Sequence, residues 1–506
     1  MDFINKRLWF IPESPLLKAF WAVFFIGILA RFVSFALLPE AAYTDALHHL
    51  MLSRDIILQQ AFLLPNWILP PPLMHALSAS ASILAGLSLE FPFVRAIPII
   101  VTVAFLLSCY LLFRKLFGNE NFIIPLSFIV VFPWLVRYGT VNYAENLALL
   151  LLVFSLYALL RFREAMRAEW LVLLAFLVPA FALTKLNATL LAPLLFILVL
   201  VSAFRKKIPL KWIALFAIIA IALSAFWFVS THNAFGYWSE LDASRPVEGA
   251  EFQSRGSITP QSLFLSHLSL YDFPPTESFR NIPQLSGLPV VPLQALFFLL
   301  TIPLTLAMLW GFFRAMKSPH GRKLHLMLGI MALALIGLSV WNRVNGVLYI
   351  RYLIPIIPLA AVFFCRGFVE MKSAKMKSVL ALCFAVFAVY SLALTSVSAY
   401  YYAKNLEQSN GMIEFVKALP KDTKIFSQES GRAIAFYSGK ETGFDRAVYL
   451  MNPEEAIAKI ISSGFTHIAV SCYKPTFPQK LLDSLESKNL IARIYNDSCT
   501  TVYAVN

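Results

Sequence analysis

Long apolar runs dominate the chain from about residue 17 to residue 400, and short polar segments separate them. A helix needs about 20 apolar residues to cross a hydrocarbon core about 30 Å thick. Runs of this kind predict membrane spans at 17–38, 93–113, 121–137, 144–162, 169–184, 187–204, 211–231, 290–314, 323–341, 347–366 and 377–400. The first run is too long for the core of a cleaved signal peptide, so we expect it to be retained. The pattern predicts a polytopic α-helical membrane protein with about eleven transmembrane helices.

Composition supports this interpretation, because 59% of the 506 residues are hydrophobic and only 14% are charged. A soluble protein carries roughly a quarter charged residues, so an ordinary soluble enzyme, a disordered chain and a disulfide-stapled secreted domain are excluded. The net charge of +14 would suggest nucleic acid on a soluble protein. Here the basic residues cluster in short loops beside apolar runs, which is the mark of membrane orientation, and no nucleic-acid partner is expected.

The segment 71–89 decides the orientation, because it is apolar but interrupted by His75 and several serines. If it lies on the outer surface instead of spanning, all the basic clusters fall on one side of the membrane. Those clusters are Arg114/Lys115, Arg161/Arg163/Arg167, Arg205/Lys206/Lys207/Lys211, Arg314/Lys317/Arg322/Lys323 and Arg366/Lys372/Lys375/Lys377. The positive-inside rule favours this arrangement. We therefore expect a multi-pass plasma or cell membrane protein with a cytoplasmic N-terminus and an extracytoplasmic C-terminus.

Three sizeable segments then lie on the outer face: a first loop at about 39–92, a large loop at about 232–289, and the tail. The tail changes composition and reads as a small α/β domain. Strands are expected at 424–427, 467–472, 490–495 and 501–505, and helices at 411–419, 453–463 and 478–487. This predicts a transmembrane domain at 1–403 and a soluble domain at 404–506. Cys472 and Cys499 either form a disulfide or stay free thiols, and the five scattered cysteines show no metal-binding spacing.

Acids and bases recur in these outer loops among apolar neighbours. The acids are Asp45 and Glu145, and the bases are Arg137, Lys185, Arg343 and Arg351. Asp45 stands near the start of an expected helix, where an N-cap is the alternative role, and any single base could simply extend to the membrane edge. An isolated charge at that depth costs several kcal/mol, which favours paired or functional groups. As a set they suit a substrate with a lipid tail and a phosphate head, since Arg and Lys hold phosphate oxygens and a carboxylate can act as general base.

The order of these features resembles the GT-C membrane glycosyltransferases, in particular the protein O-mannosyltransferase and lipid A aminoarabinose transferase branch. The segments that carry the resemblance are Thr44-Asp45-Ala46, Pro70-Pro71-Pro72-Leu73, Glu145, Thr184-Lys185, Arg351-Tyr352-Leu353-Ile354-Pro355 and the tail passage at 433–440. Ala46 departs from the branch, which has a second acid at this position. The Trp-Trp-Asp-Tyr-Gly signature of oligosaccharyltransferases is absent from the chain.

The resemblance implies transfer of one sugar, a hexose or a pentose, from a dolichyl- or undecaprenyl-phosphate donor to an acceptor protein, lipid or glycan at the outer face. Asp45 would be the general base of an inverting reaction. The implied donor-phosphate ligands are Lys185, Arg343, Arg351 and Arg137, and the implied substrate-orienting residues are Glu145, Tyr143, His48, His49, His232, Tyr237 and Trp238. No cofactor is required. A divalent ion shared by Asp45 and Glu145 stays an alternative, which the missing second acid disfavours.

Two other classes remain open. A transporter or flippase for a lipid-linked solute would explain the many spans, but it predicts repeated halves and polar groups near the bilayer midplane. The sequence shows only Arg31 inside the first span and no repeat. A non-catalytic membrane scaffold whose outer domain binds a partner is the third alternative, and it predicts that Asp45 is dispensable.

Overall fold

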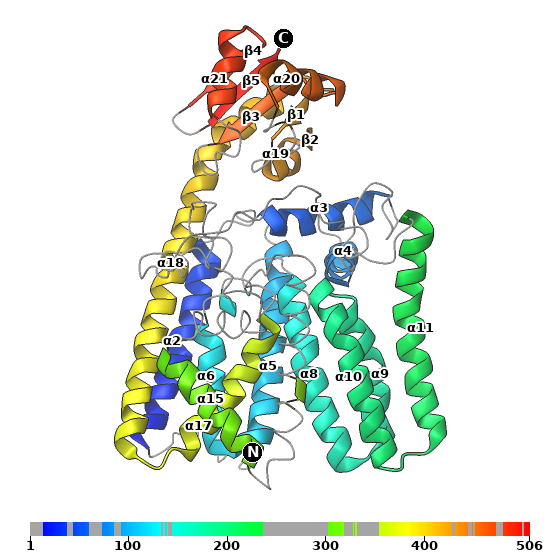
Figure 1. The fold of residues 1–506 in the computed structure, drawn as a ribbon, viewed down its shortest axis with the longest axis vertical. Coiled ribbons are helices and arrows are strands. Elements are labelled where there is room, and N and C mark those ends of the chain that lie inside the picture. The colour runs from blue at the N-terminus through cyan, green and yellow to red at the C-terminus, as the bar shows by residue number, and fades with distance from the viewer. Residues whose placement is uncertain are drawn as a thin grey trace.

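The computed structural model describes residues 14–37, 44–59, 73–85, 93–132, 135–136, 139, 144–235, 302–317, 327, 329–330, 354–427, 431–443, 448, 451–471, 479–497 and 500–506. A bundle of long helices forms the larger part, and a small domain with a sheet stands at one end of it (Figure 1). The described bundle helices are α2 (Pro15–Leu37), α5 (Phe93–Asn121), α6 (Ile123–Val131), α8 (Ala144–Ala165), α9 (Ala168–Ala182), α10 (Leu186–Arg205), α11 (Leu210–Phe235), α15 (Ile302–Lys317), α17 (Ile357–Glu370) and α18 (Ala374–Ala418).

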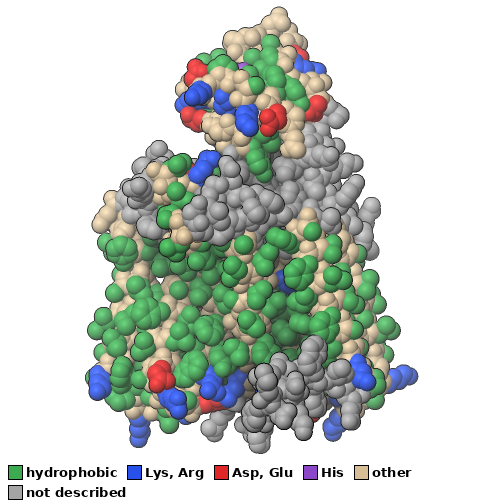
Figure 2. Space-filling view, turned by 180° about the vertical axis from the view of Figure 1, so that it is seen from behind, with side chains coloured by type: hydrophobic (Ala, Val, Ile, Leu, Met, Phe, Trp, Pro, Cys, Tyr) green, Lys and Arg blue, Asp and Glu red, His purple; other side chains and the backbone are tan. Residues whose placement is uncertain are grey.

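The outside of the bundle is largely apolar (Figure 2). Large side chains such as Phe226, Ile218 and Val389 are exposed on its surface, where Figure 2 shows a broad hydrophobic belt. Among the described helices, five are long and apolar enough to cross a membrane. A helix surrounded by apolar side chains on every face belongs in lipid or in a large core. The predicted span at 323–341 lies almost entirely outside the described residues.

Inside the bundle, aromatic rings and glycines set the distances between helices. The Phe128 and Phe384 rings stack with centroids 6.1 Å apart and so join α6 to α18. Between α15 and α17, a Cβ on Gly311 would lie 1.9 Å from the Phe363 carbonyl oxygen, and one on Gly367 would lie 2.1 Å from the Ala307 carbonyl oxygen. Only glycine permits this approach, as is common where membrane helices pack closely.

Basic side chains gather at the end of the bundle opposite the sheet domain (Figure 2). They come from the turns that join α8 to α9, α10 to α11 and α17 to α18. At the same end Lys115 pairs with Glu164, and Glu370 pairs with Arg314 and Arg366. The described part of the bundle therefore has the one-sided charge distribution on which the predicted orientation rests; which side of the membrane it faces stays a prediction.

Two shorter helices, α3 (Thr44–Gln59) and α4 (Leu73–Ala85), pack against each other at the other end of the bundle. They lie across the bundle and face the sheet domain (Figure 1). This agrees with the prediction that the segment after residue 71 is a surface helix rather than a span. α4 begins at Leu73, whose N–H donates a hydrogen bond of 2.9 Å to the Leu183 carbonyl at the end of α9.

The helix α18 differs from the prediction, because it continues for 45 residues from the last span into the soluble domain. The sequence suggested a break near residue 404 and a separate helix at 411–419. No proline interrupts the segment between them, and its residues are compatible with a helix, so hydrogen bonding continues through Gly411. At 1.5 Å per residue the helix is about 68 Å long, roughly twice the thickness of the hydrocarbon core.

The soluble domain is a five-stranded sheet in the order β2-β1-β3-β5-β4. Its strands are β1 (Lys424–Phe426), β2 (Glu441–Gly443), β3 (His467–Ser471), β4 (Ile491–Asn496) and β5 (Thr500–Val505), and its helices are α19 (Gly431–Ser438), α20 (Pro453–Ser462) and α21 (Gln479–Ser487). β1 pairs in parallel with β2 and β3, whereas β5 pairs antiparallel with β3 and β4. The four expected strands are confirmed; β2 and α19 were not predicted. Cys472 and Cys499 lie outside the described residues.

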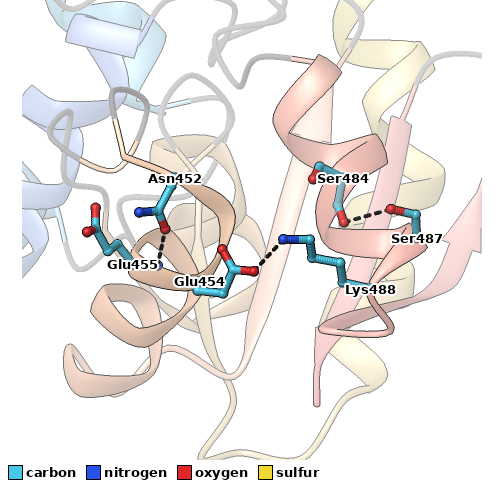
Figure 3. Close-up of polar contacts among 6 residues, drawn as sticks. All are labelled: Asn452, Glu454, Glu455, Ser484, Ser487 and Lys488. Carbon is cyan, nitrogen blue, oxygen red and sulfur yellow. Dashed lines mark hydrogen bonds and ion pairs between the residues drawn. The ribbon is translucent and has the colours of Figure 1, made fainter.

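Polar contacts lie on the surface of this domain at α20 and α21, and one of them connects the two helices (Figure 3). The Asn452 side chain caps α20 by accepting a 2.9 Å hydrogen bond from the Glu455 N–H, and Lys488 pairs with Glu454 across the two helices. Both partners of the ion pair are exposed, so the pair contributes little to stability. These contacts support the domain and have no feature of a ligand site.

Candidate functional site

A buried ion pair joins two of the residues that the sequence singled out. Glu145 lies in the first turn of α8, Lys185 directly precedes α10, and the Lys185 ammonium donates to Oε1 of Glu145. The side chain of Glu145 is 1% exposed and that of Lys185 is 15% exposed. Within the described part of the chain, Oε2 of Glu145 is buried and has no hydrogen-bond partner. The pair thus contains a buried carboxylate oxygen to which none of the described residues donates.

Local geometry explains the position of Lys185. α9 ends at Ala182, where the Thr184 hydroxyl donates 2.7 Å to the Phe181 carbonyl. The backbone of Lys185 is extended, at φ −163° and ψ 156°, and α10 begins at the next residue. A cation at the positive end of a helix is unfavourable, and Glu145 offsets this cost. Because free N–H groups at a helix start attract anions, this turn could also hold a second anion such as a phosphate.

The helix α4 begins beside this turn. The hydrogen bond from Leu73 to Leu183 places the start of α4 two residues from Lys185. The buried face of α4 includes His75, Ser78 and Ser82, which are polar. Leu73, Glu145 and the Thr-Lys turn, which belong to three of the segments that the sequence singled out, therefore meet at one end of the bundle.

Asp45 is the second residue of α3, so its backbone lies in the first turn of that helix. His48 and His49 follow about one turn later. For Asp45, His48 and His49 the structure describes the backbone but not the side chains. α3 packs on α4, and the first residue of α4 is hydrogen-bonded to Leu183, so Asp45 lies on a helix that is connected to the Glu145–Lys185 pair through α4. At the far end of α3, burial raises the pKa of the Asp55 carboxyl, and the Arg54 charge opposes this shift.

Of the remaining predicted site residues, the structure describes only His232. His232 lies in the last turn of α11, which packs against α9, and it is half-buried. Arg137, Tyr143, Tyr237, Trp238, Arg343 and Arg351 lie outside the described residues. Among the residues that the structure describes, no group of three or more His, Cys, Asp or Glu side chains could hold a metal ion.

Sequence reasoning missed a polar network beside Glu145. The Asn146 amide donates 3.3 Å to the Thr102 hydroxyl, which in turn donates 3.0 Å to the Gly139 carbonyl. It links α5, α8 and the segment between α6 and α8, and so fixes the start of α8 where Glu145 lies. The only sequence signal was a single threonine and a single asparagine in apolar surroundings.

Arg31 has a structural role. Its guanidinium donates to the carbonyls of Ile129, Val130 and Leu135 at 3.1, 3.3 and 2.7 Å. α6 ends at Val131, so these carbonyls include orphan acceptors of the last turn, which a buried cation satisfies. The midplane charge that could have supported a transporter thus stabilises a helix end.

Comparison with known proteins agrees with this architecture. The sequence profile of the family described as dolichyl-phosphate-mannose-protein mannosyltransferase matches residues 70–229, which include α4, Glu145 and Lys185. Comparison with curated protein sequences gave no match. Among solved structures, ArnT from Cupriavidus metallidurans bound to undecaprenyl phosphate superposes with a TM-score of 0.59 at 13% identity, over 97% of this chain and 98% of that chain.

An archaeal enzyme is similar to the same extent. The Archaeoglobus fulgidus oligosaccharyltransferase in the apo form gives a TM-score of 0.61 at 13% identity, over 92% of this chain and 70% of that chain. The archaeal oligosaccharyltransferase AglB from Archaeoglobus fulgidus, in complex with an inhibitory peptide and a dolichol-phosphate, gives a TM-score of 0.57 at 12% identity, over 96% of this chain and 74% of that chain. This chain has the GT-C fold. This fold confirms the architecture that the sequence resemblance implied.

Proposed function

We propose that this GT-C chain is an inverting glycosyltransferase that moves one sugar from a polyprenyl-phosphate donor to an acceptor at the outer membrane face. The observation that carries the proposal is the buried Glu145–Lys185 pair at the start of α10 and beside α4, with a carboxylate oxygen to which no described residue donates. The pair lies in the part of the chain that matches the mannosyltransferase family. Two proteins of the same fold were solved with undecaprenyl phosphate and with a dolichol-phosphate, respectively.

In the proposed reaction, Asp45 takes the proton of the acceptor hydroxyl while the acceptor oxygen attacks the anomeric carbon of the sugar. The new bond forms as the bond from that carbon to the phosphate oxygen breaks, and the configuration inverts. Polyprenyl phosphate leaves with both electrons of the broken bond. Lys185 and the start of α10 stabilise the charge that develops on it, as preorganised electrostatic groups do.

The remaining predicted residues have supporting roles in the proposal. Arg137, Arg343 and Arg351 bind the donor phosphate together with Lys185. Glu145 holds Lys185 in place and accepts a hydrogen bond from a sugar hydroxyl at Oε2. Tyr143, His48, His49, His232, Tyr237 and Trp238 orient donor or acceptor. The transferred sugar is a hexose or a pentose, the acceptor is a protein, lipid or glycan, and no metal ion is required.

The proposed orientation puts the N-terminus in the cytoplasm and the sheet domain outside. What supports it is the gathering of basic residues at the end of the bundle away from that domain (Figure 2). A donor outside the cytoplasm has to arrive on a lipid, because nucleotide sugars are absent there. Protease protection of the soluble domain in sealed inside-out vesicles checks this orientation.

The transfer reaction can be tested in proteoliposomes with radiolabelled short-chain polyprenyl-phosphate sugars and a membrane extract of the source as acceptor. Asp45→Asn should lower turnover by at least about 10²-fold, the usual contribution of a general base. Asp55→Asn is the matched control, because it makes the same change at the other end of α3 and should leave transfer within about twofold of wild type. Normal transfer by Asp45→Asn overturns the assignment of the base. Movement of labelled lipid between leaflets without transfer overturns the proposed class.

A further inference from the structure

The soluble domain is fixed to the end of α18 by its own core. Met412 and Val416, in the last two turns of α18, are buried against Ile425 of β1 and Ile434 of α19. Phe415 of the same helix stacks on Tyr495 of β4 with ring centroids 4.9 Å apart. Since α18 also belongs to the bundle, this core joins the domain to the bundle through one continuous helix.

Lys440 adds a second attachment at the same place. It follows α19 after Gly439, whose φ of +71° turns the chain sharply. Its side chain points inward, the residue is 6% exposed, and its ammonium donates to the carbonyls of Leu419 and Pro420 at 2.6 and 2.7 Å. These carbonyls follow the C-terminal end of α18, where a cation is favoured. A buried ammonium needs such partners, so Lys440 holds the end of α19 on the end of α18.

On its other side, α19 contacts α3. Figure 1 shows α19 as the element of the domain that lies above α3. α3 carries Asp45 in its first turn and packs on α4, and α4 is hydrogen-bonded to the turn that carries Lys185. A continuous series of contacts therefore runs from α18 through α19, α3 and α4 to the Glu145–Lys185 pair.

We infer that the soluble domain is a positioning element of the membrane-embedded site, with Lys440 as its positioning residue. By holding α19 on α18, Lys440 keeps α19 packed on α3 and so sets the position of Asp45 relative to Lys185. Surface helices that pack only on each other and on one bundle end are mobile without such support. The effect on transfer rests on the proposed function, whereas the effect on α3 does not.

The first test displaces the domain without altering any of its side chains. One alanine inserted after Asn405, beyond the apolar part of α18, rotates everything that follows by about 100° and lifts it by about 1.5 Å. Hydrogen exchange of the α3 amides should become about tenfold faster, because α19 no longer covers them. Turnover should fall by at least about tenfold while the KM for the donor changes less than about twofold, as expected for a misplaced catalytic group.

The second test addresses the positioning residue. Lys440→Ala should accelerate exchange of α3 and lower turnover in the same way, and Lys440→Arg, which keeps a cationic donor, should restore both. Lys421→Ala is the matched control, because Lys421 is an exposed lysine in the turn that directly follows Pro420. It should change neither exchange of α3 nor turnover.

The outcomes separate the two proposals. Unchanged exchange of α3 in both the insertion and Lys440→Ala, with β3 and β5 still protected, overturns the inference. If Lys440→Ala unfolds the domain, the alanine insertion alone tests the inference, because it leaves the core of the domain intact. If the wild-type protein transfers no sugar from any donor, the proposed function fails, and exchange of α3 still tests the positioning role.

Discussion

The Glu145–Lys185 pair gives the sharpest prediction on stability. Lys185→Met removes the partner of a carboxylate that is 1% exposed and leaves that charge buried and uncompensated. Breaking a buried pair in this way costs about 3–5 kcal/mol. Two features reduce the cost: Lys185 is 15% exposed, and removing a cation from a helix start recovers about 0.3–1 kcal/mol. We expect Lys185→Met to lower the free energy of unfolding by about 2–4 kcal/mol.

Removing the charge of Glu145 instead of that of Lys185 should lower the free energy of unfolding by less. Glu145→Gln keeps the shape of the side chain but removes its charge, and Lys185 can still reach solvent, so we expect a loss of about 1–2 kcal/mol. In the double variant neither charge is left unpaired, and it should be more stable than Lys185→Met alone. The double-mutant cycle should therefore return a coupling energy of at least about 1 kcal/mol.

Unfolding of the purified protein in mixed micelles by increasing SDS, followed by tryptophan fluorescence, measures these differences. Lys115→Met is the matched control, because Lys115 and Glu164 form an ion pair at the opposite end of the bundle with side chains 28% and 32% exposed. An accessible pair contributes about 0.2–1 kcal/mol. If Lys185→Met costs no more than Lys115→Met, or if the cycle shows no coupling, the reasoning about a buried, mutually dependent pair is refuted.

Two further predictions concern helix packing and pH. Gly367→Ala places a Cβ 2.1 Å from the Ala307 carbonyl oxygen, so α15 and α17 must separate. In the same SDS titration the free energy of unfolding should fall by about 1–3 kcal/mol. An unchanged midpoint of the titration contradicts the close approach of the two helices. Burial lowers the pKa of His467 at the start of β3, so the folded domain favours the neutral ring. The contribution of this ring to the stability of the domain should be fully present above about pH 6.5 and decline as the pH falls below that value. Amide exchange of β3, corrected for the pH dependence of the intrinsic exchange rates, should show this decline in the wild-type protein but not in His467→Gln. If the stability of β3 depends on pH equally in both proteins, the effect belongs to another group.

The sequence by itself was sufficient for the elements that depend on local pattern. A run of about 20 apolar residues is long enough to cross a bilayer whatever packs around it, so the bundle helices could be placed from their lengths. The interrupted segment after residue 71 could be assigned to the surface because basic clusters report orientation. The tail strands at residues 424, 467, 491 and 500 follow from β-branched and apolar runs between turn residues.

Only the tertiary structure decided which polar groups meet. Glu145 and Lys185 are 40 residues apart, and Arg31 is about a hundred residues from the carbonyls that it satisfies. The sequence identified all three as unusual but gave no partner for any of them. A helix that is apolar on every side has no polar stripe to show which face turns inward, so its rotation, and with it each charge pairing, is set by packing. The same holds for α18 and Lys440: local propensity allows a long helix, but its role as the support of α19 exists only because the domain core closes around its end.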